Sequence, residues 1–328
     1  MWLLMDYAPP VSWDLARRVA RRAAGQLPDI DPRELDMLTA DLRVTARRAG
    51  ELAAAHLGLE SVGATSVRVV DWAGWSRAAR HMAEAVVGEL SLTPRPAGVG
   101  SALRGLGNGL LAGLAMGRVS RQLLGQYDAV TGDDALYLVA PTILQHERRH
   151  AFVPEHFRLW VALHEQTHAL QFRAAPWLRD YVRERMAVVA DDEVQIAEAL
   201  IAWQETGDLV SLLVSREAHT QLHELTALMT LLEGHADLVS DTVGCRHATT
   251  VGKMRKAFAR PQRTGRLANA SATLDKQAQY RDGLAFCRTV VRRRSWKFLS
   301  RAFADPGNLP TMSEISDPQA WIDRQRRG

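Results

Sequence analysis

Apolar residues recur at spacings of three and four along most of the chain, a pattern typical of amphipathic helices. The first clear helix start is Asp31-Pro32-Arg33-Glu34, with Asp as the cap, Pro at the first helical position and Glu in the first turn. The spacing continues from there to about His56. It predicts further helices over residues 155–172, 177–203, 209–243 and 275–294.

Two short stretches have a different pattern. Residues 66–72 alternate and are rich in β-branched side chains, which predicts either a short strand or the lead-in to a helix. Residues 135–140 predict a short strand that ends at Pro141. The fold is therefore expected to be mainly α, helical with a few short strands.

The periodicity weakens in two places. Residues 248–273 contain Pro261, Gly265 and many basic and small side chains, so this segment is a candidate mobile loop. The tail after Pro306 is also expected to be loop-like. Because there is no internal repeat and no other clear boundary, we expect one domain over residues 1–328, with the loop inside it.

Four glycines stand four positions apart, at Gly105, Gly109, Gly113 and Gly117. On a helix they form one stripe, and each glycine costs roughly 1 kcal/mol relative to alanine. Close approach of a second helix would offset that cost, which is the interpretation we favour over a membrane dimer seam. The glycines do not follow a strand as a phosphate-binding fingerprint would.

The composition is that of a folded, soluble protein. Hydrophobic residues make up 47% and charged residues 24%. No apolar run is long enough to span a membrane, and the N-terminus lacks the basic segment of a secretory signal, so a cytoplasmic location is expected. The two cysteines, Cys245 and Cys287, exclude a disulfide-dense scaffold and are expected to be free, buried thiols.

The charge is unevenly distributed along the chain, although its net value is only +4. Residues 253–301 contain 14 Lys and Arg against 2 acids, whereas residues 179–241 contain 13 acids against 4 arginines. We interpret these segments as oppositely charged surfaces of one domain that partly face each other. A basic face for an anionic ligand or a nucleic acid is the alternative, and nucleic acid is disfavoured because aromatic residues are not interleaved with the basic ones.

The most specific chemical signal is the segment His164-Glu165-Gln166-Thr167-His168. Histidines at positions i and i+4 lie one turn apart on the same helix face and can converge on one Zn²⁺ ion. Glu165 follows the first histidine and can take a proton from a water at the metal, which is the metalloprotease arrangement. The apolar residues that precede the motif predict that its helix is buried. Removing two histidines from water without a metal to bind would cost free energy, so a buried helix favours a metal site.

A third ligand is expected in the apolar helix around residues 231–237. Glu233 and Asp237 are four apart and share a face, so Glu233 can bind the ion while Asp237 accepts the free ring N–H of a ligand histidine. His235 is the competing ligand, but it lies about 200° around the helix from Glu233, so both cannot easily reach one ion. We favour Glu233 because that choice also gives Asp237 a role.

The remaining histidines are weaker candidates. His219 and His223 are also four apart but lie in a polar stretch, which predicts a solvated helix face. His146 and His150 flank charged residues and predict an exposed turn or helix start. No glutamate follows His219, whereas Glu147 follows His146 and is itself followed by two arginines.

At these residues the sequence resembles a family of zincin-like proteins that are named as hydrolases and associated by name with biosynthesis of the deazaflavin coenzyme. The resemblance extends over nearly the whole chain, at residues 11–16, 124–128, 138–141, 164–168, 231–237, 276–283 and 308–321. It implies a zincin-like metallopeptidase fold that is mainly helical. It also implies a metal site of His164, His168 and Glu233, with Glu165 as the base. Thr142 and Thr273 depart from the family pattern, where Asn and Gly are expected, and both departures leave the metal site untouched.

Two functional hypotheses follow. The first is a zinc-dependent hydrolase, most simply a metallopeptidase, that acts on a peptide or protein. The second is a catalytically inactive zincin-fold protein that keeps its metal and binds a protein partner or an anionic cofactor. Hydrolysis would also need a group that stabilises an oxyanion, for which Tyr280 and Arg281 are weak candidates.

Overall fold

The structure is a computed structural model that describes residues 5–6, 11–89, 95–96, 99–191, 216–258 and 270–327. It is mainly helical, with short strands, which confirms the predicted fold class. The chain divides into two compact units: unit 1 contains Met1–Thr45 and Thr65–Phe152, and unit 2 contains Ala46–Ala64 and Val153–Gly328. The prediction of a single domain stays a prediction, and each unit is described by itself.

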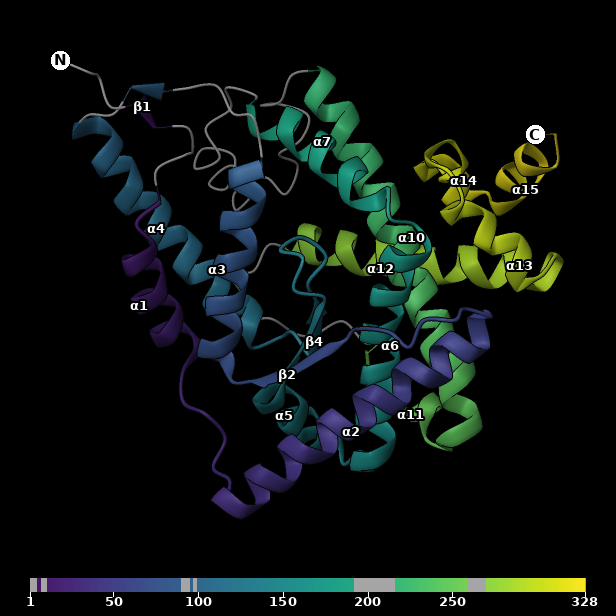
Figure 1. The fold of residues 1–328 in the computed structure, drawn as a ribbon, viewed down its shortest axis with the longest axis horizontal. Coiled ribbons are helices and arrows are strands. Elements are labelled where there is room, and N and C mark those ends of the chain that lie inside the picture. Colours follow the sequence, from purple (N-terminus) through teal and green to yellow (C-terminus); the bar gives the residue numbers. More distant parts are fainter. Residues whose placement is uncertain are drawn as a thin grey trace. The chain divides into compact units, whose positions relative to one another are not determined.

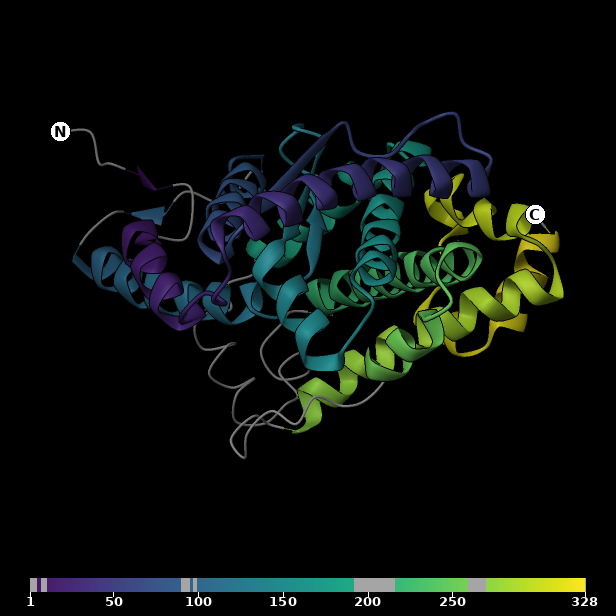
Figure 2. The ribbon, with the colours of Figure 1, turned by 90° about the horizontal axis from the view of Figure 1, so that it is seen from below.

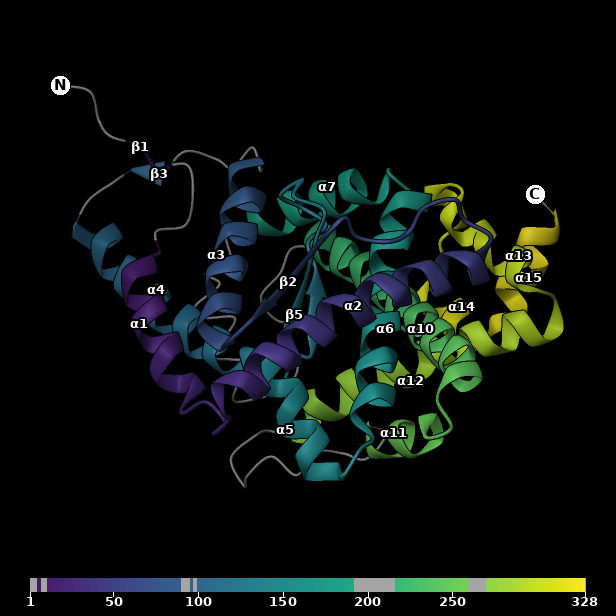
Figure 3. The same cartoon turned by 60° about the horizontal axis from the view of Figure 1, so that its bottom comes forward.

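Unit 1 contains a small sheet with strand order β2-β5-β4. Strand β2 (Ser66–Val70) runs parallel to β5 (Ala135–Val139), and β4 (Gly125–Tyr127) pairs with β5 in the antiparallel direction. The two long strands lie side by side in Figure 3. Every residue of β5 is buried, as expected for a central strand. Both predicted strands are therefore present, and residues 66–70 form a strand rather than a helix lead-in.

Helices surround this sheet within unit 1. They are α1 (Trp13–Ala24), the first part of α2 (Pro32–Leu57), α3 (Trp72–Glu89), α4 (Val99–Ser120) and α5 (Ala140–His150). The short strands β1 (Met5–Asp6) and β3 (Arg95–Pro96) form a separate antiparallel pair. Helix α2 begins at Pro32, as predicted, where the Asp31 side chain accepts from the Arg33 amide. It ends at Leu57, one residue after the predicted end.

Helices α1 and α4 lie side by side, as Figure 1 shows. The glycine stripe of α4 provides the contact surface. A Cβ on Gly109 would meet the Ser12 carbonyl oxygen at 2.5 Å, and one on Gly113 would meet the Ala16 carbonyl oxygen at 2.5 Å. The prediction that these glycines allow close approach of a second helix is confirmed.

Unit 2 is built around α6 (Pro154–Ala174) and the long helix α10 (Arg216–His247). Around them lie the last part of α2, α7 (Leu178–Asp191), α11 (Val251–Phe258) and α12 (Ala270–Arg293). The predicted helix over residues 177–203 is described only to residue 191, and that over 209–243 only from residue 216. The core of unit 2 includes the fully buried side chains of Leu178, Leu228, Leu231, Phe286 and Trp321.

Two predictions of irregular structure were wrong in part. The predicted loop over residues 248–273 contains α11, whose Val251 and Met254 are both buried, while residues 259–269 lie outside the described part. The tail after Pro306 folds into a 3₁₀ turn, η2 (Pro306–Asn308), and the helices α14 (Met312–Ser316) and α15 (Pro318–Arg327). These elements pack beside α12, together with α13 (Trp296–Leu299) and η1 (Ser300–Phe303) (Figure 2). No helix in the described residues combines the length and apolar character needed to cross a bilayer.

Candidate metal centre

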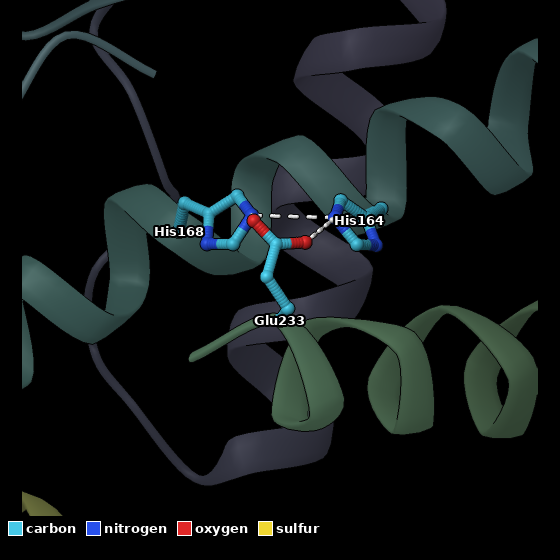
Figure 4. A group of neighbouring side chains, drawn as sticks. All are labelled: His164, His168 and Glu233. Carbon is cyan, nitrogen blue, oxygen red and sulfur yellow. Dashed lines mark hydrogen bonds and ion pairs between the residues drawn. The ribbon is translucent and has the colours of Figure 1, made fainter. Parts of the chain in front are cut away.

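Two helices of unit 2 bring three metal-binding side chains together. His164 and His168 stand one turn apart on α6, and Glu233 reaches them from α10 (Figure 4). The His164 Nε2 atom lies 3.2 Å from the His168 Nε2 atom and 3.1 Å from Glu233 Oε2. His168 Nε2 lies 3.7 Å from Glu233 Oε1. The structure thus brings together all three of the ligands that the sequence predicted, and no other group of three potential ligands of this kind occurs in the described residues.

These separations fit a tetrahedral zinc ion. With Zn–N and Zn–O distances of about 2.0–2.1 Å, neighbouring ligand atoms lie about 3.3 Å apart. The observed separations of 3.1, 3.2 and 3.7 Å lie around that value. Three protein ligands also leave the fourth tetrahedral position for water or substrate, as catalytic zinc sites require.

Asp237 sets the tautomer of His164. One turn after Glu233 on α10, its Oδ1 accepts a 3.1 Å hydrogen bond from His164 Nδ1. Burial raises the pKa of Asp237, but the hydrogen bond from His164 and the charges of His164 and Arg255 outweigh burial and lower the pKa to about 2. Because an ionised carboxylate only accepts, Nδ1 of His164 carries a hydrogen, and Nε2 is the atom left to bind a metal.

His168 has a different partner, which the sequence analysis missed. Gln171, one turn further along α6, accepts from His168 Nδ1 through its Oε1 at 2.9 Å. Burial lowers the pKa of His164, but its hydrogen bonds to Asp237 and Glu233 outweigh burial and raise the pKa well above its usual range, so without a metal the ring is an imidazolium. Two Nε2 atoms and a carboxylate converge here, and a bound metal ion would replace the Nε2 proton of His164. The spacing of His168 and Gln171, three apart on one helix face, was the only sequence signal for this contact.

His235, the competing ligand, lies away from the cluster. Its ring lies against the Phe303 ring, with centroids 5.1 Å apart, and its Nδ1 lies 3.1 Å from the Nε2 atom of Gln171. Burial and nearby His168 and His56 lower the pKa of His235 to about 3, so the ring is neutral. His235 therefore lies outside the group that Glu233 forms with His164 and His168.

Glu165 is buried on α6, with 8% of its surface exposed. Burial raises its pKa to about 7, the charge of His164 opposes this rise, and the charge of Glu233 adds to it. A carboxyl group in this range can both accept and donate a proton near neutral pH, which is the property a general base needs.

An ionic network surrounds the outer side of the centre. Arg255 of α11 donates to Asp237 at 2.7 Å and to Asp241 at 2.8 Å, and Arg288 of α12 donates to Asp241 at 2.7 Å. The Trp160 indole also donates to Asp241, at 3.1 Å. At these residues the basic segment 253–301 and the acidic segment 179–241 face each other, as the charge pattern predicted.

The sequence profile of the zincin-like metallopeptidase family matches residues 11–322. The chain belongs to this family. The match covers both units and includes the ligand helices α6 and α10, so a zincin-like fold applies to nearly all of the chain.

A solved structure supports this assignment to the zincin-like metallopeptidases. The chain is similar to a "putative hydrolase with a novel fold" from Chloroflexus aurantiacus, with 28% identity and a TM-score of 0.70. The similarity covers 97% of this chain and 99% of that protein. No protein of curated function matched. These comparisons support a hydrolase-like or metallopeptidase-like fold and leave the association with the deazaflavin coenzyme as a resemblance.

Other predicted residues of this zincin-like chain lie elsewhere. His146 is buried in α5, so the prediction of an exposed turn was wrong. The neighbouring apolar residues Ile143 and Leu144 of α5 are buried too. His223 is exposed on α10 as predicted, whereas the side chains of His219, Tyr280 and Arg281 lie outside the described part. Thr142 is buried in unit 1 between the Trp72 indole and the Ser120 carbonyl. Both cysteines are free, as predicted, and Cys287 is buried. The prediction that Cys245 is buried was wrong, because it lies on an exposed face near the end of α10.

Proposed function

We propose that this chain is a zinc-dependent hydrolase of peptide bonds, with His164, His168 and Glu233 as the metal ligands and Glu165 as the general base. One observation carries the proposal: two imidazole Nε2 atoms and a carboxylate converge within 3.1–3.7 Å. The family match and the hydrolase-like neighbour support the same reaction class. A catalytic role for the deazaflavin coenzyme is not required for this chemistry, and the link to it rests on sequence resemblance.

The roles of the side chains follow from their positions. A bound zinc ion supplies a Lewis acid and lowers the pKa of water to about 7. Asp237 and Gln171 orient the two imidazoles, so that Nδ1 of each ring is engaged and Nε2 of each would face the ion. Glu165 takes a proton from the attacking water and delivers it to the leaving amine, so that one carboxylate serves first as base and then as acid. A peptide is the proposed substrate because its leaving group needs that proton.

Metal analysis and a peptide assay on matched variants test the proposal. Purified full-length protein is stripped with a chelator, reloaded with zinc, and incubated with a library of quenched fluorescent peptides. We expect one zinc per chain and metal-dependent cleavage in the wild type. Glu165→Gln should keep the zinc and lose activity by about 10²–10⁴-fold, because it removes the proton acceptor and leaves the ligands in place.

The ligand assignment has its own test. Glu233→Ala should lose zinc, whereas His235→Ala should keep it with reduced affinity. Zinc retained in Glu233→Ala but lost in His235→Ala would overturn the third ligand. Hydrolysis that persists in Glu165→Gln contradicts the base assignment, and a zinc-loaded wild type that cleaves no peptide favours the non-catalytic zincin-fold alternative.

A further inference from the structure

A backbone carbonyl fixes the orientation of a buried glutamine next to the metal centre. Gln171 is 2% exposed, and its Nε2 atom donates to the carbonyl oxygen of Leu232 at 2.8 Å. The same nitrogen lies 3.1 Å from Nδ1 of His235. The amide nitrogen has two hydrogens, so it can satisfy both acceptors. A flipped amide would place its own oxygen against the Leu232 carbonyl, where neither atom could donate.

This orientation determines which nitrogen of His168 carries the hydrogen. With its nitrogen directed at Leu232, Gln171 can direct only its oxygen at His168 Nδ1, 2.9 Å away. An amide oxygen only accepts, so Nδ1 must be the protonated nitrogen. The Nε2 atom of His168 is left with its lone pair, directed at His164 and Glu233.

Gln171 also joins the two ligand helices. Leu232 directly precedes Glu233 on α10, and His168 precedes Gln171 by one turn on α6. One amide therefore contacts a ligand histidine on α6 and the peptide unit next to the ligand glutamate on α10. A shift of one helix relative to the other would therefore stretch a hydrogen bond of this amide as well as change the separation of the ligand atoms.

We propose that Gln171 is a positioning residue for the metal centre, and that His235 holds Gln171 in place through its Nδ1 atom. The inference rests on the proposed function in that it requires a metal at His164, His168 and Glu233. It also means that the two histidine ligands have hydrogen-bond partners of different charge. His164 has an ionised partner in Asp237, whereas His168 has a neutral one in Gln171, so His168 is the less basic ligand.

Metal affinity, rather than activity, is the primary test. Zinc dissociation constants are measured by competition with a chromophoric chelator, and the visible spectrum of the Co²⁺-substituted protein reports ligand geometry. Gln171→Met has a similar length and no hydrogen-bonding group, so we expect zinc binding to weaken by about 10–100-fold with a changed Co²⁺ spectrum. Gln171→Glu keeps an acceptor for His168 but loses both donors, so an intermediate affinity is expected.

Gln166 provides a matched control on the same helix. It is fully buried, accepts from the Ala64 amide at 2.7 Å and donates to the Ala46 carbonyl at 2.9 Å, and it contacts no ligand. Gln166→Met should lower the melting temperature of the metal-free protein while leaving the zinc affinity and the Co²⁺ spectrum of the folded protein unchanged. A general packing defect would affect both glutamine variants in the same way.

The outcomes separate this inference from the proposed function. Wild-type protein that binds no zinc removes the proposed function. Wild-type protein that binds zinc, together with a Gln171→Met variant of equal affinity and identical Co²⁺ spectrum, overturns the role of Gln171. If Gln171→Met does not fold, His235→Phe takes its place: it keeps the ring beside Phe303 but removes the acceptor, and unchanged zinc affinity there overturns the proposal.

Discussion

Arg255 donates a 2.7 Å hydrogen bond from Nη1 to Oδ2 of Asp237, the carboxylate whose other oxygen accepts from Nδ1 of His164. The side chains of Arg255 and Asp237 are only 23% and 14% exposed, so the pair is weakly screened by solvent. The guanidinium favours the ionised form of Asp237. Asp237 therefore remains an acceptor, and the His164 tautomer that presents Nε2 to a metal is maintained from α11.

The first prediction concerns the guanidinium group of Arg255. Arg255→Met should weaken zinc binding by about tenfold or more, because Asp237 loses one of the two partners that keep it ionised and directed at His164. The free energy of unfolding should fall by about 3–5 kcal/mol, since Asp237 and Asp241 remain buried without their shared partner. Zinc competition titrations and urea denaturation measure the two effects.

Arg288→Met is the control for that experiment. Arg288 also pairs with Asp241, but its side chain is 51% exposed and it does not touch Asp237. Its loss should cost less than about 1 kcal/mol and leave zinc binding unchanged. Equal effects of the two variants on zinc affinity would mean that Arg255 acts through general charge rather than through Asp237.

Those parts of the metal centre that lie within a single helix could be predicted from the sequence. His164 and His168 share a face because a helix repeats every 3.6 residues, and the same rule joins Glu233 to Asp237. That the two helices cross at these turns could not be read from spacing. It depends on tertiary packing. The charge pattern predicted that a basic and an acidic segment meet, but not which residues pair, such as Arg255 with Asp237.

The errors in the fold have physical causes of the same kind. Helix α11 was hidden because Val251 and Met254 are its only buried apolar residues, too few for a periodic pattern. The C-terminal tail, by contrast, has a sequence pattern typical of a helix start. Thr311 and Glu314 form a capping box, in which the Thr311 hydroxyl accepts from the Glu314 amide and the Glu314 carboxylate accepts from the Thr311 amide.

A second prediction concerns the helix crossing behind Glu233. Gly234 on α10 meets Gly283 on α12 so closely that a Cβ on Gly234 would overlap the Gly283 carbonyl group. Gly234→Ala should therefore lower the free energy of unfolding by about 3 kcal/mol and weaken zinc binding, because the turn that carries Glu233 must move. Chemical denaturation and zinc titration are the measurements.

Gly252→Ala on α11 is the matched substitution. A Cβ there would meet nothing within 4 Å, so the change should stabilise the protein by up to about 1 kcal/mol through helix propensity. If Gly234→Ala binds zinc with wild-type affinity, the close contact of α10 and α12 does not position Glu233.

A third prediction concerns the glycine stripe of unit 1. On Gly113 a Cβ would meet the Ala16 carbonyl oxygen at 2.5 Å and the Val19 Cβ at 2.7 Å, whereas on Gly107 of the same helix it would meet nothing within 4 Å. Gly113→Ala should destabilise the protein by about 1–3 kcal/mol, and Gly107→Ala should stabilise it by up to about 1 kcal/mol. Melting curves of the two variants should therefore move in opposite directions, and shifts of the same sign would contradict the close packing of α1 and α4.

The last prediction concerns the pH dependence of the C-terminal cap. Burial raises the pKa of Glu314, but hydrogen bonds from Arg324 and Thr311 outweigh burial, so its pKa in the folded protein is lowered. A lowered pKa stabilises the folded state at pH values above the unfolded pKa of about 4.3, and this stability is lost as the pH falls through the folded pKa. Glu314→Gln should therefore lower the free energy of unfolding by about 1–2 kcal/mol at pH 7, and the difference from wild type should shrink below about pH 4.

Urea denaturation across this pH range measures the difference in the free energy of unfolding. Glu184→Gln is the control, because the Glu184 side chain is 69% exposed and its loss should change little at any pH. A Glu314→Gln difference that stays constant down to acid pH would mean that the cap stabilises through its shape and not through its charge.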